Sequence, residues 1–152
     1  MTLNDYNRFC RSLPATTHVV QWGGAHVWKV AAKVFAIGRE NDTEVHITFK
    51  CSAMSYNLLK DLPGCRPAPY LASRGMTWIQ RTSAETLDDT GMKDYLRASY
   101  DLVAAGLPKR IREALRLTGN HLINGDTCGS PATKTAANAA PRRAAKRKGA
   151  TQ

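Results

Sequence analysis

The sequence predicts an α+β fold, in which an antiparallel β-sheet is covered on one face by helices. Apolar residues recur at helical spacing near the start of the chain and again after residue 88, whereas between residues 18 and 50 they recur at every second position. The 43% hydrophobic content of the 152 residues is ordinary for a globular protein with a core. We therefore expect one folded domain over residues 1–118 and a tail over residues 119–152.

The first expected helix begins after Thr2, which can act as its N-cap, with Asp5 in the opening turn. Pro14 ends this helix. The apolar residues between them fall on one helical face and should pack against the rest of the domain: Leu3, Tyr6, Phe9, Cys10 and Leu13.

Three strands of an antiparallel meander are expected at residues 26–30, 33–37 and 44–50, and a returning strand at residues 78–81. Ala31-Ala32 joins the first two strands tightly. Alanine lacks the preference for positive φ that two-residue hairpin turns require, so a longer turn or a bulge is the alternative.

Further helices are expected on both sides of an ordered loop. Ser52 should start a short helix that Pro63-Gly64 terminates, and the longest helix should follow Asp88-Asp89-Thr90. Residues 62–80 contain three prolines but are too aromatic and apolar for a disordered linker. A basic turn or short helix is expected over residues 109–117, with two apolar residues directed inward: Ile111 and Leu115.

The formal net charge of +10 is unevenly distributed along the chain. Residues 1–117 carry 16 Lys and Arg against 11 Asp and Glu, while residues 118–152 carry 6 against 1. Large apolar residues are scarce in this last quarter, and disorder is expected from about Gly125 onward. Such a tail favours a polyanionic partner, either nucleic acid or an anionic surface, although basic tails also serve only to increase solubility or derive from an expression vector.

Several classes of protein are not indicated. No apolar run approaches the roughly 20 residues of a membrane-spanning helix, and the first residues lack the pattern of a signal peptide, so we expect a cytoplasmic protein that does not bind membranes. The four cysteines are scattered, without C-x-x-C pairs or histidines at zinc-finger spacing, so free and mostly buried thiols are expected, with no metal site and no cofactor. No nucleophile motif or Gly-rich phosphate-binding loop is present, and Gly23-Gly24 is expected to be only a turn. We expect no enzymatic activity.

Five separated motifs follow one another along the chain. They are Ser12-Leu13-Pro14; Trp28-Lys29-Val30 with Lys33-Val34-Phe35-Ala36; Thr48-Phe49-Lys50-Cys51; Leu62-Pro63-Gly64-Cys65-Arg66-Pro67 with Tyr70 and Arg74 to Trp78; and Ser99-Tyr100-Asp101-Leu102-Val103 with Leu107-Pro108-Lys109-Arg110. With these motifs, residues 3–116 resemble the bacterial MmcQ/YjbR family of small DNA-binding proteins. The resemblance implies a frataxin-like (CyaY-like) fold and a double-wing mode of DNA binding. The chain departs from the family at Ala31-Ala32, where Gly or Asp is usual, and after Pro67, where a Gly often follows.

Basic residues in strands, loops and the last helix are the candidate DNA contacts of the folded domain: Lys33, Lys50, Arg66, Arg74, Lys109 and Arg110. Lys50 is a motif residue by resemblance, Lys33 lies at a hairpin tip, and Arg74 can make bidentate contacts with phosphate or guanine. The alternatives are solvated lysines, an internal salt bridge of Arg74, and basic residues after Pro108 that only complement the dipole of the preceding helix.

Three aromatic residues could stack on unpaired bases, but we expect them to be core or packing residues: Trp28, Tyr70 and Trp78.

The tail supplies a second set of candidate DNA contacts: Lys134, Arg142, Arg143, Lys146, Arg147 and Lys148. The combined expectation is a monomeric, non-enzymatic protein that binds duplex DNA with weak sequence specificity. The alternative is an adaptor domain that binds a protein or a small ligand and does not read DNA. Loop arginines that point outward onto one basic face would favour DNA, whereas arginines that point inward around an apolar pocket would favour a ligand.

Overall fold

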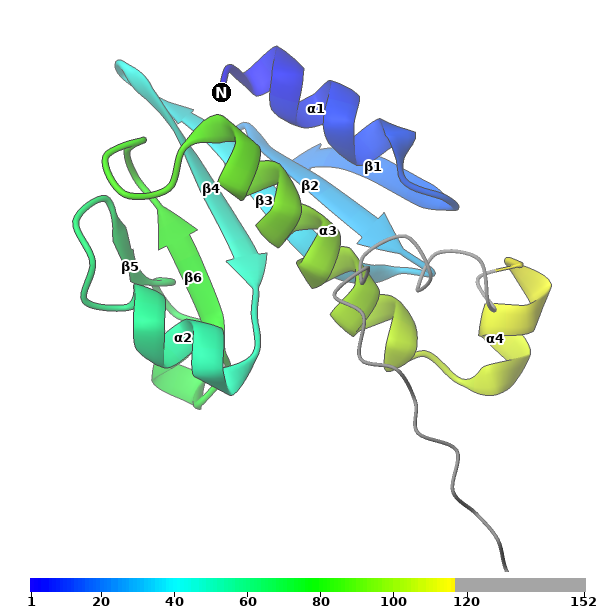
Figure 1. Cartoon of the computed structure of the whole chain (residues 1–152). Coiled ribbons are helices and arrows are strands. Elements are labelled where there is room, and N and C mark those ends of the chain that lie inside the picture. Colours follow the sequence, from blue (N-terminus) through cyan, green and yellow to red (C-terminus); the bar gives the residue numbers. More distant parts are fainter. Residues whose placement is uncertain (117–152) are drawn as a thin grey trace, which may run out of the picture.

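One antiparallel sheet organises residues 1–116, the part of the chain that this computed structural model describes. The elements in chain order are α1 (Leu3–Ser12), β1 (Thr16–Gln21), β2 (Ala25–Val30), β3 (Lys33–Asn41), β4 (Glu44–Lys50), α2 (Ala53–Leu59), β5 (Cys65–Pro67), the 3-10 helix η1 (Ala72–Arg74), β6 (Trp78–Arg81), α3 (Asp89–Ala105) and α4 (Lys109–Ala114). The six strands lie in the order β1-β2-β3-β4-β6-β5 (Figure 1). The α+β class predicted from the sequence is confirmed.

Helices α1 and α3 lie over the same face of the sheet, and the core fills the space between them and the strands (Figure 1). The largest fully buried side chains come from both helices and from the central strands: Trp28, Tyr6, Tyr100, Phe35, Phe49, Ile47, Ile79, Met92 and Leu96. Burial of these apolar surfaces is the main source of stability for a domain of this size.

The predicted N-cap of α1 is confirmed. The Thr2 hydroxyl oxygen accepts the N–H of Asp5 at 3.1 Å, and the Asp5 carboxylate accepts the N–H of Thr2 at 3.3 Å, which together form a capping box. One turn later the Tyr6 ring packs so closely on Gly38 of β3 that a Cβ atom at Gly38 would lie 2.4 Å from the ring. This crossing of helix and strand therefore requires glycine at position 38.

The connection between β2 and β3 combines a tight turn with a bulge. Ala31 and Ala32 form the turn with φ values of 46° and 64°, a left-handed backbone that costs a residue other than glycine roughly 1–2 kcal/mol. Val30 pairs with Lys33 across the turn, and the register shifts between Trp28 and Lys29. The register shift increases the local twist of the hairpin.

Three features differ from the elements expected from the sequence. The edge strands β1 and β5 are additional: β1 reads TTHVVQ, with no regular apolar alternation, and β5 is only three residues long and contains Pro67. Ile111, expected to point inward, is 37% exposed because α4 lies beyond the end of the sheet (Figure 1). The boundary at residue 118 and the expected tail lie outside the described residues.

Candidate nucleic-acid interface

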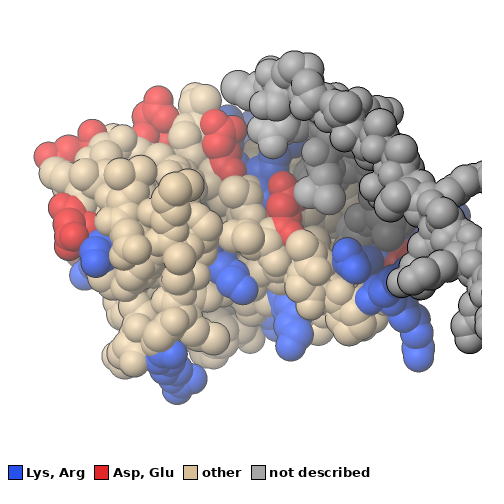
Figure 2. All heavy atoms as spheres, turned by 60° about the horizontal axis from the view of Figure 1, so that its bottom comes forward, with Lys and Arg blue, Asp and Glu red and all other residues tan. Residues whose placement is uncertain are grey.

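Charges of opposite sign gather at opposite ends of the sheet. Strand β3 begins at the edge of the sheet where β4 finishes. Trp78, the first residue of β6, pairs with Lys50, the last residue of β4, so the 3-10 helix η1 that precedes β6 lies at this edge as well. We call this end, with α4, the basic end; it carries five of the predicted contacts, Lys33, Lys50, Arg74, Lys109 and Arg110. Figure 2 brings the bottom of the Figure 1 view forward and shows Lys and Arg mainly across the lower part of this face, with Asp and Glu mostly above them.

Helix α3 anchors the strands at the basic end through Ser99. The Ser99 hydroxyl donates to the carbonyl of Phe35 at 2.6 Å and accepts the N–H of Lys50 at 2.8 Å. Directly after Lys50, the N–H of Cys51 donates to the Thr77 carbonyl at 2.9 Å, and the Thr77 hydroxyl donates to the Cys51 carbonyl at 2.7 Å. The backbone that presents Lys50 is therefore held from two sides.

The cations of the basic end differ in their accessibility. Lys33, Arg74, Lys109 and Arg110 are exposed, whereas Lys50 is half-buried. Lys109 Nζ lies 3.7 Å from Glu113 Oε1, an exposed i,i+4 pair of the kind that contributes only about 0.2–0.5 kcal/mol and that a phosphate can replace. Arg74 takes part in no ion pair within residues 1–116, so the internal salt bridge considered for it is not formed there.

Arg66 lies apart from the basic end, on the face of the sheet opposite to α1 and α3, which we call the open face. Its Nε and Nη2 donate to Gln80 Oε1 at 2.8 and 2.6 Å, and Gln80 Nε2 donates to the Thr48 hydroxyl at 3.1 Å. This chain of hydrogen bonds crosses β5, β6 and β4. The structure thus places Arg66, in β5, and Arg74, at the end of η1, on different surfaces.

The tail candidates Lys134, Arg142, Arg143, Lys146, Arg147 and Lys148 lie outside the described residues.

A groove of about 270 Å³ lies on the open face and was not expected from the sequence. Its floor includes Ile37, Thr48 and Gln80, and two aromatic residues line it from different segments: Trp22 from the β1–β2 turn and Tyr70 from the loop before η1. Trp22 is 63% exposed and Tyr70 is 85% exposed. We call this site the open-face groove.

The expectation that Tyr70 is a core or packing residue is therefore wrong, whereas Trp28 and Trp78 are buried as expected. Tyr70 follows Pro69 and has a φ of 66°, and in this left-handed turn its side chain stays in solvent at the rim of the groove. For Trp22 a sequence signal exists, because the residue directly precedes Gly23-Gly24 and a large side chain in such a turn has no neighbouring strand to pack on.

Positive charge flanks the open-face groove. Arg39 lines it, and a Cβ atom at Gly23 would lie 3.6 Å from the Arg39 guanidinium, so this cation lies close to the turn that carries Trp22. Partial burial, and then the positive charge of Arg66, lower the pKa of His46 below its usual value, while Glu44 acts in the opposite direction. At neutral pH the His46 imidazole is therefore uncharged and able to donate or accept a hydrogen bond.

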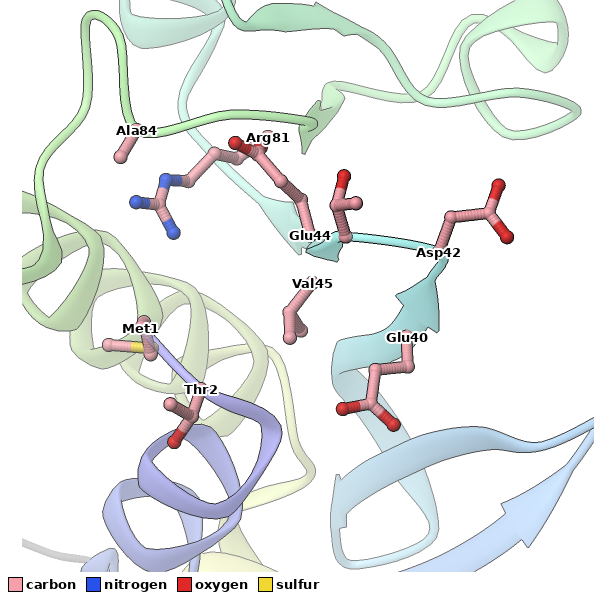
Figure 3. Close-up of a pocket in the computed structure, with 9 residues that line it drawn as sticks. Met1, Thr2, Glu40, Asp42, Glu44, Val45, Arg81 and Ala84 are labelled. Atoms are coloured by element: carbon pink, nitrogen blue, oxygen red, sulfur yellow. The ribbon is translucent and has the colours of Figure 1, made fainter.

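A second hollow, of about 330 Å³, lies at the acidic end of the sheet, opposite to the basic end. Figure 3 shows Glu40 near the end of β3 and Glu44 at the start of β4 across from Met1 and Thr2 at the start of α1, with Arg81 nearby. Asp42, in the β3–β4 turn, points away from α1. Arg81 is buried and donates to the Leu87 carbonyl at 2.8 Å. Residues 1–116 hold no group of three or more His, Cys, Asp or Glu side chains placed to bind a metal ion.

The thiols of the described residues are held in apolar surroundings. Cys10, Cys51 and Cys65 are free and buried, as expected. Burial raises the pKa of all three thiols, that of Cys51 to about 11. A protonated, buried thiol is a poor nucleophile.

Comparisons with known proteins place this fold. Protein DR2400 of Deinococcus radiodurans, whose domain is described as DUF419, is 21% identical with a TM-score of 0.66, and the match covers 76% of this chain and 88% of that protein. A protein from Pseudomonas syringae is 16% identical with a TM-score of 0.55, covering 68% and 99% of the two chains. At these identities the similarity concerns the fold alone.

Within residues 1–116 there is no helix with both the length and the apolar character needed to cross a membrane. None of the curated proteins matches the sequence. The family model described as YjbR matches residues 11–102, which is more than half of the chain and includes all six strands. The chain belongs to the YjbR family.

Proposed function

We propose that this protein is a non-enzymatic, cytoplasmic DNA-binding protein that contacts duplex DNA through its basic end. The observation that carries the proposal is the separation of charge along the sheet, with Lys33, Lys50, Arg74, Lys109 and Arg110 at one end and Glu40, Asp42 and Glu44 at the other. A polyanion approaching this field is attracted to one end and repelled from the other, which orients the protein before contact.

Contacts from lysines and arginines to phosphates position a protein on DNA but carry no sequence information. The basic end therefore supports binding with weak sequence preference. Each neutralised phosphate releases counterions and contributes about 0.9 to the slope of log K against log salt concentration. The six tail cations, if all meet phosphates, add roughly 5 to this slope. The domain and the tail thus bind additively through the same electrostatic effect.

The proposal is tested by fluorescence anisotropy of a labelled random 20-mer duplex with the full-length chain across a salt series. The test variant is Lys50→Ala with Arg74→Ala, at the basic end. The matched control is Arg8→Ala with Lys93→Ala, which removes the same charge from exposed positions on the helix side. The test variant should bind more weakly and lose roughly 2 from the salt slope, while the control should change little.

Equal effects of the two variants would show that only net charge matters and would reject the basic end as an interface. A variant with all six tail cations changed to Gln separates the contributions, because binding that vanishes with the tail charges cannot come from the domain.

The alternative, a ligand-binding adaptor that does not read DNA, is favoured by one observation, the open-face groove beside Arg66. Arg74 is exposed at the basic end, where the DNA hypothesis needs an accessible arginine, whereas Arg66 joins the hydrogen bonds along the floor of the groove. The two functions therefore use different surfaces of one domain, and variants of each surface can be tested separately.

A further inference from the structure

The open-face groove presents two aromatic rings to solvent in a strained backbone. Trp22 and Tyr70 line the groove and have φ values of 52° and 66°. Few large side chains adopt this left-handed region, and each such residue costs the fold free energy. Their rings are nevertheless mostly exposed, so little buried area compensates for the strain. Strained residues that the fold does not need for packing are typical of binding sites.

The floor of the groove is polar and fixed. The hydrogen bonds from Arg66 to Gln80 and from Gln80 to Thr48 hold three side chains in one row across the sheet. The Thr48 hydroxyl accepts within this row and keeps its own proton for a ligand. The floor can therefore offer hydrogen bonds to the edge of a flat ring without first reorganising.

The charge and size of the groove restrict its occupant. None of the ten described residues that line it is Asp or Glu, while Arg39 lines it and Arg66 borders its floor. Its volume of about 270 Å³ is just below the roughly 300–1,000 Å³ of pockets that enclose drug-sized ligands. The groove thus suits one ring system attached to an anionic chain better than a whole enclosed cofactor.

We propose that the open-face groove binds an unpaired base of a single-stranded nucleic acid, stacked on Trp22 or Tyr70, with the neighbouring phosphates on Arg39 and Arg66. Stacking on aromatic side chains tolerates any base, and a groove lined with cations follows the backbone of the strand. The inference rests on the proposed function in taking nucleic acid as the partner, but it assigns the single strand to a different surface from the duplex.

Tryptophan fluorescence gives a local test with the full-length chain. Trp28 and Trp78 are 2% and 7% exposed, so Trp22 is the residue among the three whose emission a stacked base should quench. An oligo-dT 12-mer should quench it, the random duplex should quench it much less, and thymidine monophosphate should bind far more weakly than the strand. A salt concentration near 200 mM limits the electrostatic contribution of the tail.

The test variant is Trp22→Ala with Tyr70→Ala, and the control is Met54→Ala with Leu58→Ala, two exposed apolar residues of α2. Anisotropy with labelled oligo-dT should show at least a tenfold loss of affinity for the test variant and none for the control, since stacking of bases on aromatic side chains is a main source of affinity for single strands. Trp22→Phe with Tyr70→Phe, which keeps both rings, should retain most of the affinity.

The results separate this inference from the proposed function. Wild-type duplex binding with neither quenching by oligo-dT nor binding of labelled oligo-dT in the anisotropy assay, or unchanged oligo-dT affinity in the test variant, overturns the inference alone. Quenching by thymidine monophosphate at the same concentration as by the strand also overturns it, in favour of a free nucleotide. Single-strand quenching that survives in Lys50→Ala with Arg74→Ala supports two separate surfaces, and absent duplex binding overturns the proposed function alone.

Discussion

The two faces of the sheet use aromatic residues in opposite ways. On the helix face, Tyr6, Phe35 and Phe49 are fully buried in one core. On the open face, Trp22 and Tyr70 remain in solvent although their backbone is left-handed. A buried ring stabilises the fold because its apolar surface is removed from water. An exposed ring in a strained turn does not contribute this stabilisation. The core on the helix face is therefore a main source of stability, and the rings of Trp22 and Tyr70 are free to bind a partner.

The largest expected effect of a single substitution lies on the helix face. Phe49→Ala should lower the free energy of unfolding by about 3–5 kcal/mol, because it empties a fully buried site next to the Tyr95 ring. Tyr70→Ala, which removes a larger but exposed ring, should change it by less than about 0.5 kcal/mol. Urea denaturation followed by circular dichroism measures both values. Similar losses for the two variants would contradict the distinction between the faces.

The second effect concerns the hydrogen bonds that join α3 to the sheet. Ser99→Ala leaves the N–H of Lys50 and the carbonyl of Phe35 without their side-chain partner and should cost about 1–3 kcal/mol. Ser73→Ala is the matched control, because the exposed Ser73 hydroxyl also donates to a carbonyl, that of Tyr70, at 3.0 Å. Ser73→Ala should change the free energy of unfolding by less than about 0.5 kcal/mol, since water replaces the lost hydrogen bond. If Ser99→Ala leaves the free energy of unfolding unchanged, water must replace the Ser99 hydroxyl at these strand ends.

Most of the helix face was predictable from the sequence, because burial on one side imposes a period on the residues. The face of α1 with Tyr6 and Cys10 and the strand residues Ile47 and Phe49 follow this period, and all four are buried as predicted. The capping of α1 by Thr2 was predictable for a local reason, since its partner lies three residues away.

The open-face groove could not be predicted in the same way, because no period links its residues. They come from the β1–β2 turn, from the four inner strands and from the loop before η1, and only the sheet topology brings them together. Arg66 and Arg74 stand close in sequence, yet one lies on the open face and the other at the basic end. Separation in sequence is a poor guide to position wherever a loop crosses from one surface to another.

The third effect would separate strain from packing on the open face. Trp22→Asn should raise the free energy of unfolding by about 0.5–1 kcal/mol, because asparagine tolerates the left-handed backbone that a φ of 52° imposes. The same variant should lose quenching and affinity with oligo-dT. Val20→Asn, another exposed apolar residue of the same hairpin, should instead lower stability slightly, because asparagine is unfavourable in strands. If Trp22→Asn lowers the free energy of unfolding as much as Val20→Asn does, the Trp22 ring stabilises the turn by more than the left-handed backbone destabilises it.

The smallest expected effect is a change in the pKa of His46, which reports the charge near the open-face groove. Because the pKa of His46 is lowered in the folded state, the unfolded chain takes up a proton first as the pH falls. The contribution of His46 to stability is therefore complete above its unfolded pKa of about 6.5 and declines as the pH falls toward its lowered folded value.

Arg66→Gln removes the cation beside His46 and should raise the pKa of its imidazole toward the usual value, while partial burial keeps it somewhat lowered. Arg74→Gln removes the same charge at the basic end and should leave this pKa unchanged. NMR titration of the imidazole protons distinguishes the two variants. Equal shifts would mean that His46 senses only net charge, and the positive potential assigned to the open-face groove would then not be local. A phosphate bound beside Arg66 should act in the same direction as Arg66→Gln, so oligo-dT should also raise the His46 pKa if the strand lies in the groove.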